Sequence, residues 1–477
     1  MAKFAQHFGL GKTQSELDFV NVKLDRDNPL FVDPYAISLR LDEWGVSAHR
    51  QLSSFFQSVI DAIRQGREAD ARELLAHLQE PNETRLGLSK GRPQGAGIGP
   101  GQADDLYTAL SKSEAVRTGT LTSLEECELM IEGIGNDKIS DLATNVLRGN
   151  LIEYTKAQCT LHGVAVSQVA IGPTFNPQRR QWENAYVDLP VVGGLPVLLV
   201  PKSIVRRKPA YEHRKFYQHY ALNFLQAEHL RVHSGLVTTL KNGRERVYKK
   251  DLIVDFPCAK AQLLAFAQKH PDVLENYRLE LAALHSRPPS NPIEPEDEIA
   301  LAVALRTALA AIPAGNPDAG RYHSLMIGIV EFVFFPNLVF PRKEQEIHQG
   351  RKRIDIDVEN AAIDGAFHRM HDVRHVPCNY VPIECKNYSS DIANPELDQM
   401  IGRFSVRRGR LGMILCRQFN NRPLFVERCR DTWGDGHGVI LCIDDQIVNQ
   451  WLGMLERNAR ADIDIHVNEL IGEVMRA

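Results

Sequence analysis

The sequence predicts a mixed α+β protein whose C-terminal part has an α/β arrangement, a mixed sheet flanked by helices, preceded by a larger mixed α+β N-terminal region. A chain of 477 residues is long for one hydrophobic core, which favours more than one domain. The contents of 43% hydrophobic and 24% charged residues are those of a globular protein rather than a disordered or membrane chain. Segments with helical apolar spacing also alternate with short apolar runs typical of strands.

A proline-rich segment, Arg287–Glu298, divides the chain. Its four prolines lie among polar and acidic residues, which forbids a regular helix or a central strand. We expect a linker here between two parts. Residues 1–290 would form a region that regulates activity or recognises a substrate, with room for two subdomains. Residues 298–477 would form a single domain.

Before the linker, three stretches have the apolar spacing of helices: Leu52–Arg64, Leu142–Cys159 and Phe216–Leu230. The apolar run Val187–Val200 is interrupted by two glycines, Gly193 and Gly194, which predicts a hairpin. The glycine-rich segment Lys90–Gln102 is expected to be a loop.

Several classes of protein are not expected. Gly11-Lys12-Thr13 has the end of a phosphate-binding loop, but Gln6 stands where that loop needs glycine and no strand precedes it. The eight cysteines have no CxxC pair and no zinc spacing, so we expect reduced thiols in a cytoplasmic protein. A signal sequence and an apolar stretch long enough for a membrane span are both missing, so no membrane partner is expected.

After the linker the predicted elements follow the order ααβββαβαβ. Helices are expected at Glu298–Ile312 and Tyr322–Phe335, strands at Leu338–Phe340, Lys352–Val358 and Val381–Cys385, a helix at Pro395–Arg407, a strand at Leu411–Cys416, a short helix from Pro423 and a strand at Gly438–Ile443.

Charged residues gather on two neighbouring strands of this region. Glu384 and Lys386 are two residues apart, so they share one face of a strand, and Asp355 and Asp357 share the polar face of the strand before. Two carboxylates can chelate Mg²⁺ or Mn²⁺, with the carbonyl of Cys385 as a further ligand, and the metal stabilises charge on a phosphate. A lysine beside them can lower the pKa of the attacking water and hold the phosphate.

The segment Tyr322–Ile443 resembles the PD-(D/E)XK, or restriction-endonuclease-like, nuclease superfamily, which has an αβββαβ core. The resemblance implies that Asp355 is the first motif carboxylate and that Glu384-Cys385-Lys386 is the (D/E)xK. It also implies catalytic roles for Glu331 in the preceding helix and Gln399 in the following one.

Two features depart from the superfamily pattern. Ile354 replaces the proline before the aspartate, and the segment Glu359–Tyr380 between the motif strands is long. Asp357 therefore remains an alternative to Asp355 as the metal ligand.

Because the formal net charge is -4, a nucleic-acid site has to be a local patch. Arginines follow the motif closely, and we expect the first four to bind phosphate: Arg403, Arg407, Arg408 and Arg410, continued by Arg417, Arg422, Arg428 and Arg430. Further basic clusters are Lys202–Lys208, Lys241–Lys250 and Arg342–Arg353. Tyr211, Phe216, Tyr217 and Tyr220 interleave with Arg214 and Lys215, either to stack on bases or to pack a helix face.

These observations predict a Mg²⁺- or Mn²⁺-dependent endonuclease acting on nucleic acid, with DNA the favoured substrate and RNA left open as the alternative. The resemblance implies restriction or anti-phage defence as its setting, and a homo-oligomer, since cutting both strands takes two sites. The alternative is a nucleic-acid-binding or assembly protein that keeps the fold without catalysis.

Overall fold

The structure is a computed structural model that describes residues 2–78, 80–87, 100–121, 123–184, 186–285, 297–343, 356–390, 392, 394–405 and 408–476. Two of the predicted site residues, Asp355 and Arg407, lie outside these ranges. So do most of the expected loop Lys90–Gln102 and all of the expected linker except its last two residues.

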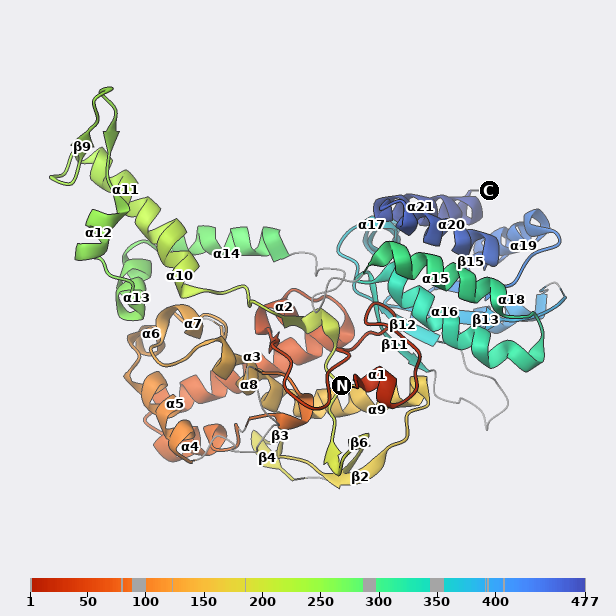
Figure 1. The fold of residues 1–477 in the computed structure, drawn as a ribbon, viewed down its shortest axis with the longest axis horizontal. Coiled ribbons are helices and arrows are strands. Elements are labelled where there is room, and N and C mark those ends of the chain that lie inside the picture. The colour runs from red at the N-terminus through yellow and green to blue at the C-terminus, as the bar shows by residue number, and fades with distance from the viewer. Residues whose placement is uncertain are drawn as a thin grey trace.

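The chain is mixed α+β, as predicted, and forms two lobes, each with its own hydrophobic core (Figure 1). The N-terminal core draws on residues 4–281, and the C-terminal core on residues 302–474. Three residues that follow the linker, Phe335, Val339 and Phe340, belong to the N-terminal core. The lobes are therefore joined by a packed contact. None of the helices in the described part of the chain is long and apolar enough to cross a membrane.

The N-terminal lobe is a helical body with small two-stranded sheets. Its helices are α1 (Phe4–His7), α2 (Pro34–Ser38), α3 (Glu43–Arg64), α4 (Glu68–Leu75), α5 (Pro100–Lys112), α6 (Glu114–Thr118), α7 (Cys127–Met130), α8 (Asn136–Val146) and α9 (Arg148–His162). Its strands are β1 (Phe31–Val32), β2 (Ser167–Ala170), β3 (Thr174–Asn176), β4 (Gln181–Glu183), β5 (Tyr186–Leu189), β6 (Val191–Val192), β7 (Leu195–Pro196) and β8 (Val205–Arg206).

The two-glycine hairpin is confirmed. β6 and β7 pair across Gly193 and Gly194, whose φ angles of 59° and 81° suit a tight two-residue turn. The helix predicted at Leu142–Cys159 is wrong in one respect, because the chain breaks at Leu147 into α8 and α9. At the break, Arg148 is buried and donates to Glu83 and to the carbonyl of Pro173. These tertiary contacts outweigh the continuous helical spacing.

An arm extends from the N-terminal lobe away from the C-terminal lobe, at the upper left of Figure 1. It consists of α10 (His213–Phe216), a π-helical turn (Tyr217–Ala221), α11 (Leu222–Arg231), β9 (Thr238–Thr239), β10 (Glu245–Arg246) and α12 (Lys249–Asp255). The helices α13 (Lys260–Lys269) and α14 (Pro271–His285) lie at its base. Phe216, Tyr217 and Tyr211 are buried in the core. They pack a helix face and are not available to stack on bases.

The C-terminal lobe has helices around one five-stranded sheet. Its elements are α15 (Glu298–Ala311), α16 (Ala319–Phe334), β11 (Leu338–Lys343), β12 (Ile356–Asn360), α17 (Gly365–His368), β13 (Tyr380–Lys386), α18 (Asn394–Ile401), β14 (Leu411–Cys416), α19 (Arg422–Gly434), β15 (Val439–Asp444), α20 (Asp445–Glu456) and α21 (Arg460–Met475). The strand order is β11-β12-β13-β14-β15. The pairs β11·β12 and β12·β13 are antiparallel, and β14 and β15 continue the sheet parallel to β13.

The predicted order ααβββαβαβ is confirmed, with four differences. The short helix α17 lies within the long segment between β12 and β13, and α20 and α21 follow the last predicted strand. The helix predicted at Pro395–Arg407 is α18, which ends at Ile401. The helix near Pro423, expected to be short, runs for 13 residues as α19.

The edge strand β11 is covered by the N-terminal lobe. The Phe340 backbone N–H donates to Asp18 at 3.1 Å, and the Pro341 carbonyl accepts from Gln158 at 2.9 Å. An uncovered edge strand invites pairing with other chains. Here side chains of the N-terminal lobe make hydrogen bonds with the backbone of this edge strand.

Candidate active site

The site is built at the end of β13, where an apolar strand carries its charges on one face. Val381 and Ile383 are fully buried on one side of the sheet. Glu384 and Lys386 lie on the opposite side, as their spacing predicts. Glu384 is itself 0% exposed. A carboxylate buried this completely needs cationic partners close by.

Glu384 has two such partners. Its Oε2 lies 2.7 Å from Lys386 Nζ, and its Oε1 lies 2.9 Å from Arg403 Nε. Lys386 also donates to Gln399 Oε1 at 3.1 Å. The structure therefore brings together three predicted residues, Glu384, Lys386 and Gln399, and adds Arg403 to them. The side chains of Lys386 and Arg403 are 12% and 9% exposed, so the cluster reaches the surface through these cations.

A close approach of α18 to the sheet makes this cluster possible. Gly412 in β14 lies beneath Met400, and a Cβ at this position would lie 2.5 Å from Met400 Sδ. Only a residue without a side chain leaves room for α18 at this height. Gln399 lies in α18, and Arg403 lies in the turn after it, where its backbone N–H donates to the Met400 carbonyl at 3.0 Å. From these positions Gln399 contacts Lys386 and Arg403 contacts Glu384.

The register of β12 against β13 brings Asp357 to the same face. Asp357 is opposite Pro382, two residues before Glu384, so both lie on the polar side of the sheet. Ile356 is opposite Ile383 on the buried side. Asp355, the other candidate ligand, lies outside the described residues.

The described cluster offers a hard divalent cation one carboxylate, that of Glu384. Both contacts of Glu384 are ion pairs, and neither oxygen accepts a hydrogen bond from the described residues. Glu384 thus keeps acceptor capacity of the kind that Mg²⁺ and Mn²⁺ use. Within the described ranges, no three His, Cys, Asp or Glu side chains are close enough to hold a metal together. A metal site here needs a second carboxylate.

Glu331 lies in a different environment from the one the resemblance implies. It is 3% exposed and pairs with Lys202 of the N-terminal lobe at 2.9 Å. Burial raises the pKa of Glu331 to about 7, against the opposing effect of the Lys202 ammonium. Lys12 of the N-terminal lobe contacts the same helix, α16, by donating to the Ser324 carbonyl. This pair belongs to the contact between the lobes.

The arginines that follow the motif are dispersed. Arg403 contacts Glu384, whereas Arg417 pairs with Asp445. Arg422 pairs with Glu473, and Arg430 donates to the Glu473 carbonyl. Arg410 is exposed and Arg408 is half-buried. Three of these arginines, Arg403, Arg417 and Arg422, are thus paired with carboxylates of the same lobe, which the linear pattern does not reveal.

Comparison with known proteins gives one match. Residues 9–212 match a family described as a domain of unknown function (DUF8370). No curated protein and no solved structure matches the chain. The family match covers most of the helical body of the N-terminal lobe and ends before the arm, so the cluster around Glu384 lies wholly outside it.

Proposed function

We propose that this protein is a nuclease that hydrolyses phosphodiester bonds in nucleic acid, DNA above all, with a divalent metal ion. The observation that carries the proposal is the buried carboxylate Glu384 beside Lys386 at the end of β13. The mixed sheet around it supports the proposal, because the order of helices and strands along this part of the chain agrees with the predicted one.

Each residue of the cluster has a role in this proposal. Glu384 would hold the metal together with Asp355 or Asp357, and the metal, when bound, supplies positive charge to the phosphate. Lys386, fixed between Glu384 and Gln399, would hold the attacking water and the phosphate. Arg403 would neutralise the buried carboxylate while the metal is absent.

The register of the sheet supports Asp355 as the partner. Asp355 is bonded to Ile356, and Ile356 is opposite Ile383, the residue before Glu384. Asp357 shares the same face and keeps its place as the alternative.

One observation favours a second function. Arg403 Nε lies 2.9 Å from the carboxylate that would hold the metal. An arginine in this position would also keep Glu384 neutralised permanently, as in a nucleic-acid-binding or assembly protein without catalysis.

A cleavage assay decides between the two functions. The full chain is incubated with supercoiled plasmid, linear duplex DNA or RNA, in Mg²⁺, Mn²⁺ or EDTA. We expect metal-dependent cleavage of DNA that disappears in Glu384→Gln and persists in Glu427→Gln, an exposed carboxylate of α19. Thermal unfolding of each variant verifies the fold. No cleavage by the wild-type chain on any substrate, or cleavage that survives Glu384→Gln, would overturn the nuclease proposal.

A further inference from the structure

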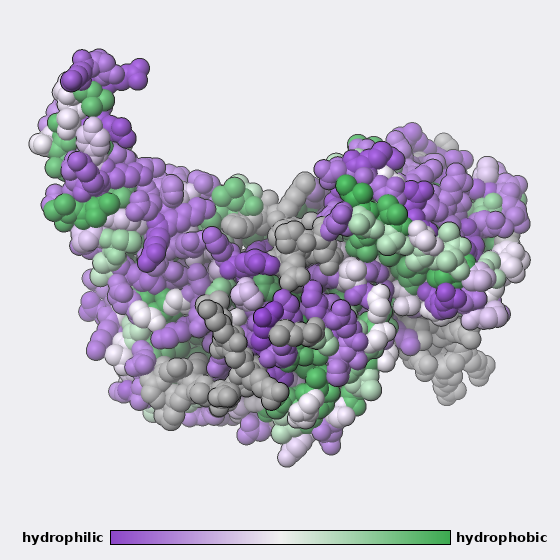
Figure 2. Space-filling model, in the orientation of Figure 1, coloured by the Kyte–Doolittle hydropathy of each residue, from purple (hydrophilic) through white to green (hydrophobic). Residues whose placement is uncertain are grey.

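The arm of the N-terminal lobe ends in a basic hairpin that no function above uses. Residues 241–250 contain five cations and one carboxylate, in a chain of net charge -4. We name the four exposed cations among them the arm-tip cations: Lys241, Arg244, Arg246 and Lys250. Figure 2 shows hydrophilic residues covering this tip, which stands clear of the rest of the protein.

The arm-tip cations have no carboxylate partner among the described residues, whereas their neighbours do. Glu245, the carboxylate within the hairpin, lies 3.5 Å from His233. Arg231, at the end of α11, pairs with Glu228 at 2.9 Å. Lys249, the fifth cation, donates to the Gln218 carbonyl. Four positive charges at the tip are thus left for an external anion.

Two of these cations lie beside the same aromatic ring. The Arg246 guanidinium lies 5.0 Å from the centre of the Tyr248 ring, and Lys250 Nζ lies 5.4 Å from the same centre. The ring attracts each cation. Tyr248 thus keeps two positive charges in one neighbourhood, and an external anion would be attracted to both.

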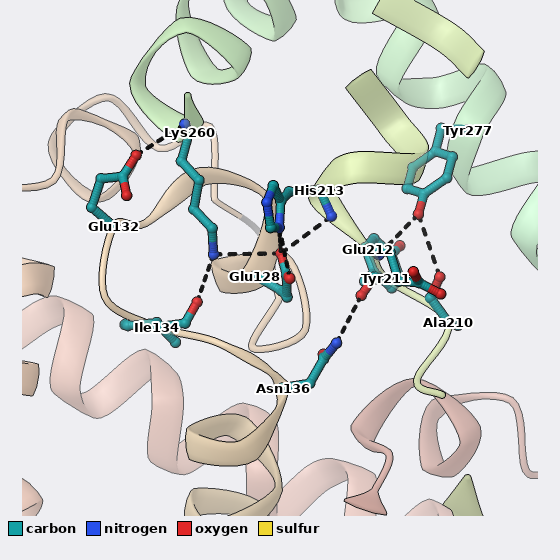
Figure 3. A network of polar contacts seen from close by, with 10 residues as sticks. All are labelled: Glu128, Glu132, Ile134, Asn136, Ala210, Tyr211, Glu212, His213, Lys260 and Tyr277. Carbon is teal, nitrogen blue, oxygen red and sulfur yellow. Dashed lines mark hydrogen bonds and ion pairs between the residues drawn. The ribbon is translucent and has the colours of Figure 1, made fainter. Parts of the chain in front are cut away.

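The hairpin is fixed to a rigid support. Val247, directly after β10, is 1% exposed, and its carbonyl accepts from Gln226 of α11 at 2.6 Å. The base of the arm is tied to α7 through Glu128, which contacts His213 at 2.9 Å and Lys260 at 3.4 Å (Figure 3). The cations are therefore presented by an ordered element, which lowers the entropy lost on binding.

We propose that the arm-tip cations bind the phosphate backbone of duplex nucleic acid, at a distance from the cluster around Glu384. Phosphate groups repeat along a duplex and suit a row of unpaired cations, and a two-stranded ribbon is narrow enough to enter a major groove. In Figure 1 the hairpin and β13 lie in opposite lobes. The arm would thus contact a long substrate remote from the cleaved bond. Its choice of ligand rests on the proposed function.

The test measures binding without catalysis, so that it stands apart from the nuclease assay. The full chain carrying Glu384→Gln is titrated with long duplex DNA in EDTA at several salt concentrations. The arm variant combines four substitutions in this background: Lys241→Ala, Arg244→Ala, Arg246→Ala and Lys250→Ala. The matched control combines Arg67→Ala, Arg72→Ala, Lys156→Ala and Arg179→Ala, four cations that already pair with carboxylates.

Loss of four phosphate contacts should remove about four from the slope of log affinity against log salt. Between about 50 and 200 mM salt this slope corresponds to an affinity change on the order of 100-fold. We expect the arm variant to lose this dependence and the control to keep it.

Equal affinity and equal salt slopes in both variants would overturn the inference, whether or not the wild-type chain cuts DNA. The same result on DNA with loss of binding to vesicles of anionic lipid would also overturn it, and would assign the tip to a membrane surface. Loss of DNA binding by the arm variant alone supports the inference even where the nuclease proposal has failed.

Discussion

Two glutamates of the C-terminal lobe, Glu331 and Glu384, each form a buried pair with a lysine, and the surroundings of the two pairs differ. In one, Glu331 is paired with Lys202, and the lysine side chain is 1% exposed. In the other, Glu384 is paired with Lys386, whose side chain is 12% exposed and also bound to Gln399. The first pair is sealed between two lobes. The second lies at a strand end, with a second cation, Arg403, also near the surface.

The difference shows that chemical type alone does not identify a site. Both pairs combine a carboxylate and an ammonium at less than 3 Å, in a low-dielectric environment. Only the pair at the strand end can be reached by a substrate, because the other lies beneath the N-terminal lobe. Access, not charge, separates a structural pair from a candidate for catalysis.

The largest expected effects come from removing each lysine in turn. Lys386→Met should lower the rate of metal-dependent cleavage at least about 100-fold, since it removes a group placed beside the reacting phosphate. Lys202→Met should lower the free energy of unfolding by about 3 kcal/mol or more, because Glu331 is left buried without its cation. Urea unfolding and single-turnover cleavage measure the two effects. Equal loss of cleavage per folded molecule in both variants would remove the distinction between the pairs.

The next effect concerns the height of α18 above the sheet. Gly412→Ala introduces a Cβ against Met400 and should cost about 1–3 kcal/mol of stability, because a well-packed core resists added volume. Cleavage should also fall, since Gln399 moves with α18. Gly434→Ala at the end of α19 is the control, because no atom would lie within 4 Å of its Cβ. A fully stable Gly412→Ala protein would contradict the packing argument.

A smaller effect follows from the raised pKa of Glu331. Its pKa is about 7 in the folded protein, above the usual value of 4.5, so the folded state holds the proton more strongly than the unfolded state does. The stability that the Glu331 proton contributes is therefore fully present below about pH 4.5 and is lost as the pH rises through about 7. Glu331→Gln cannot ionise, so it should be more stable than the wild type at pH 8, by more than about 1 kcal/mol, and nearly equal at pH 5.

Unfolding by urea at the two pH values tests the sign. A Gln variant that is less stable than the wild type at pH 8 would show that the ionised pair with Lys202 is favourable overall. The two glutamate–lysine pairs would then differ only in whether a substrate can reach them.

The smallest effect is expected for an exposed arginine of the predicted basic stretch. Arg410→Ala should change stability by less than about 0.5 kcal/mol, as is usual for exposed side chains. Arg403→Ala leaves Glu384 Oε1 without its cation and should cost about 1 kcal/mol or more. Thermal unfolding of the two variants side by side measures the difference. Equal melting temperatures would mean that Arg403 contributes nothing to the buried cluster.

The sequence allows much of the C-terminal lobe to be predicted, because each helix and strand is determined by residues that are close together in the chain. Alternating residues in Val381–Lys386 predict the strand and place Glu384 and Lys386 on one face, and both features are observed. The helical spacing of α16 is also visible in the sequence. What a single helix cannot reveal is which neighbour covers it. Glu331 was assigned to the site on the basis of its helix, yet its partner, Lys202, lies 129 residues earlier in the chain.

Arg403, unlike Glu331, belongs to the cluster around Glu384, although its predicted role was a different one. It was predicted to bind nucleic acid as one of a row of arginines, and its contact with Glu384 depends on the height of α18 above Gly412. The spacing of four from Gln399 was the available signal. Two of the arginines beyond it, Arg417 and Arg422, are paired with carboxylates of α20 and α21, which the linear spacing does not reveal.

The cover over β11 has a consequence for how the chain is made. The residues that satisfy this edge, Asp18 and Gln158, leave the ribosome long before Phe340 and Pro341 do. Domains generally fold in the order of their synthesis. The strand therefore emerges toward a surface that is already formed, and its open side is occupied as the sheet assembles. Residues 298–477 produced alone would lack that surface, and we expect them to self-associate through this strand.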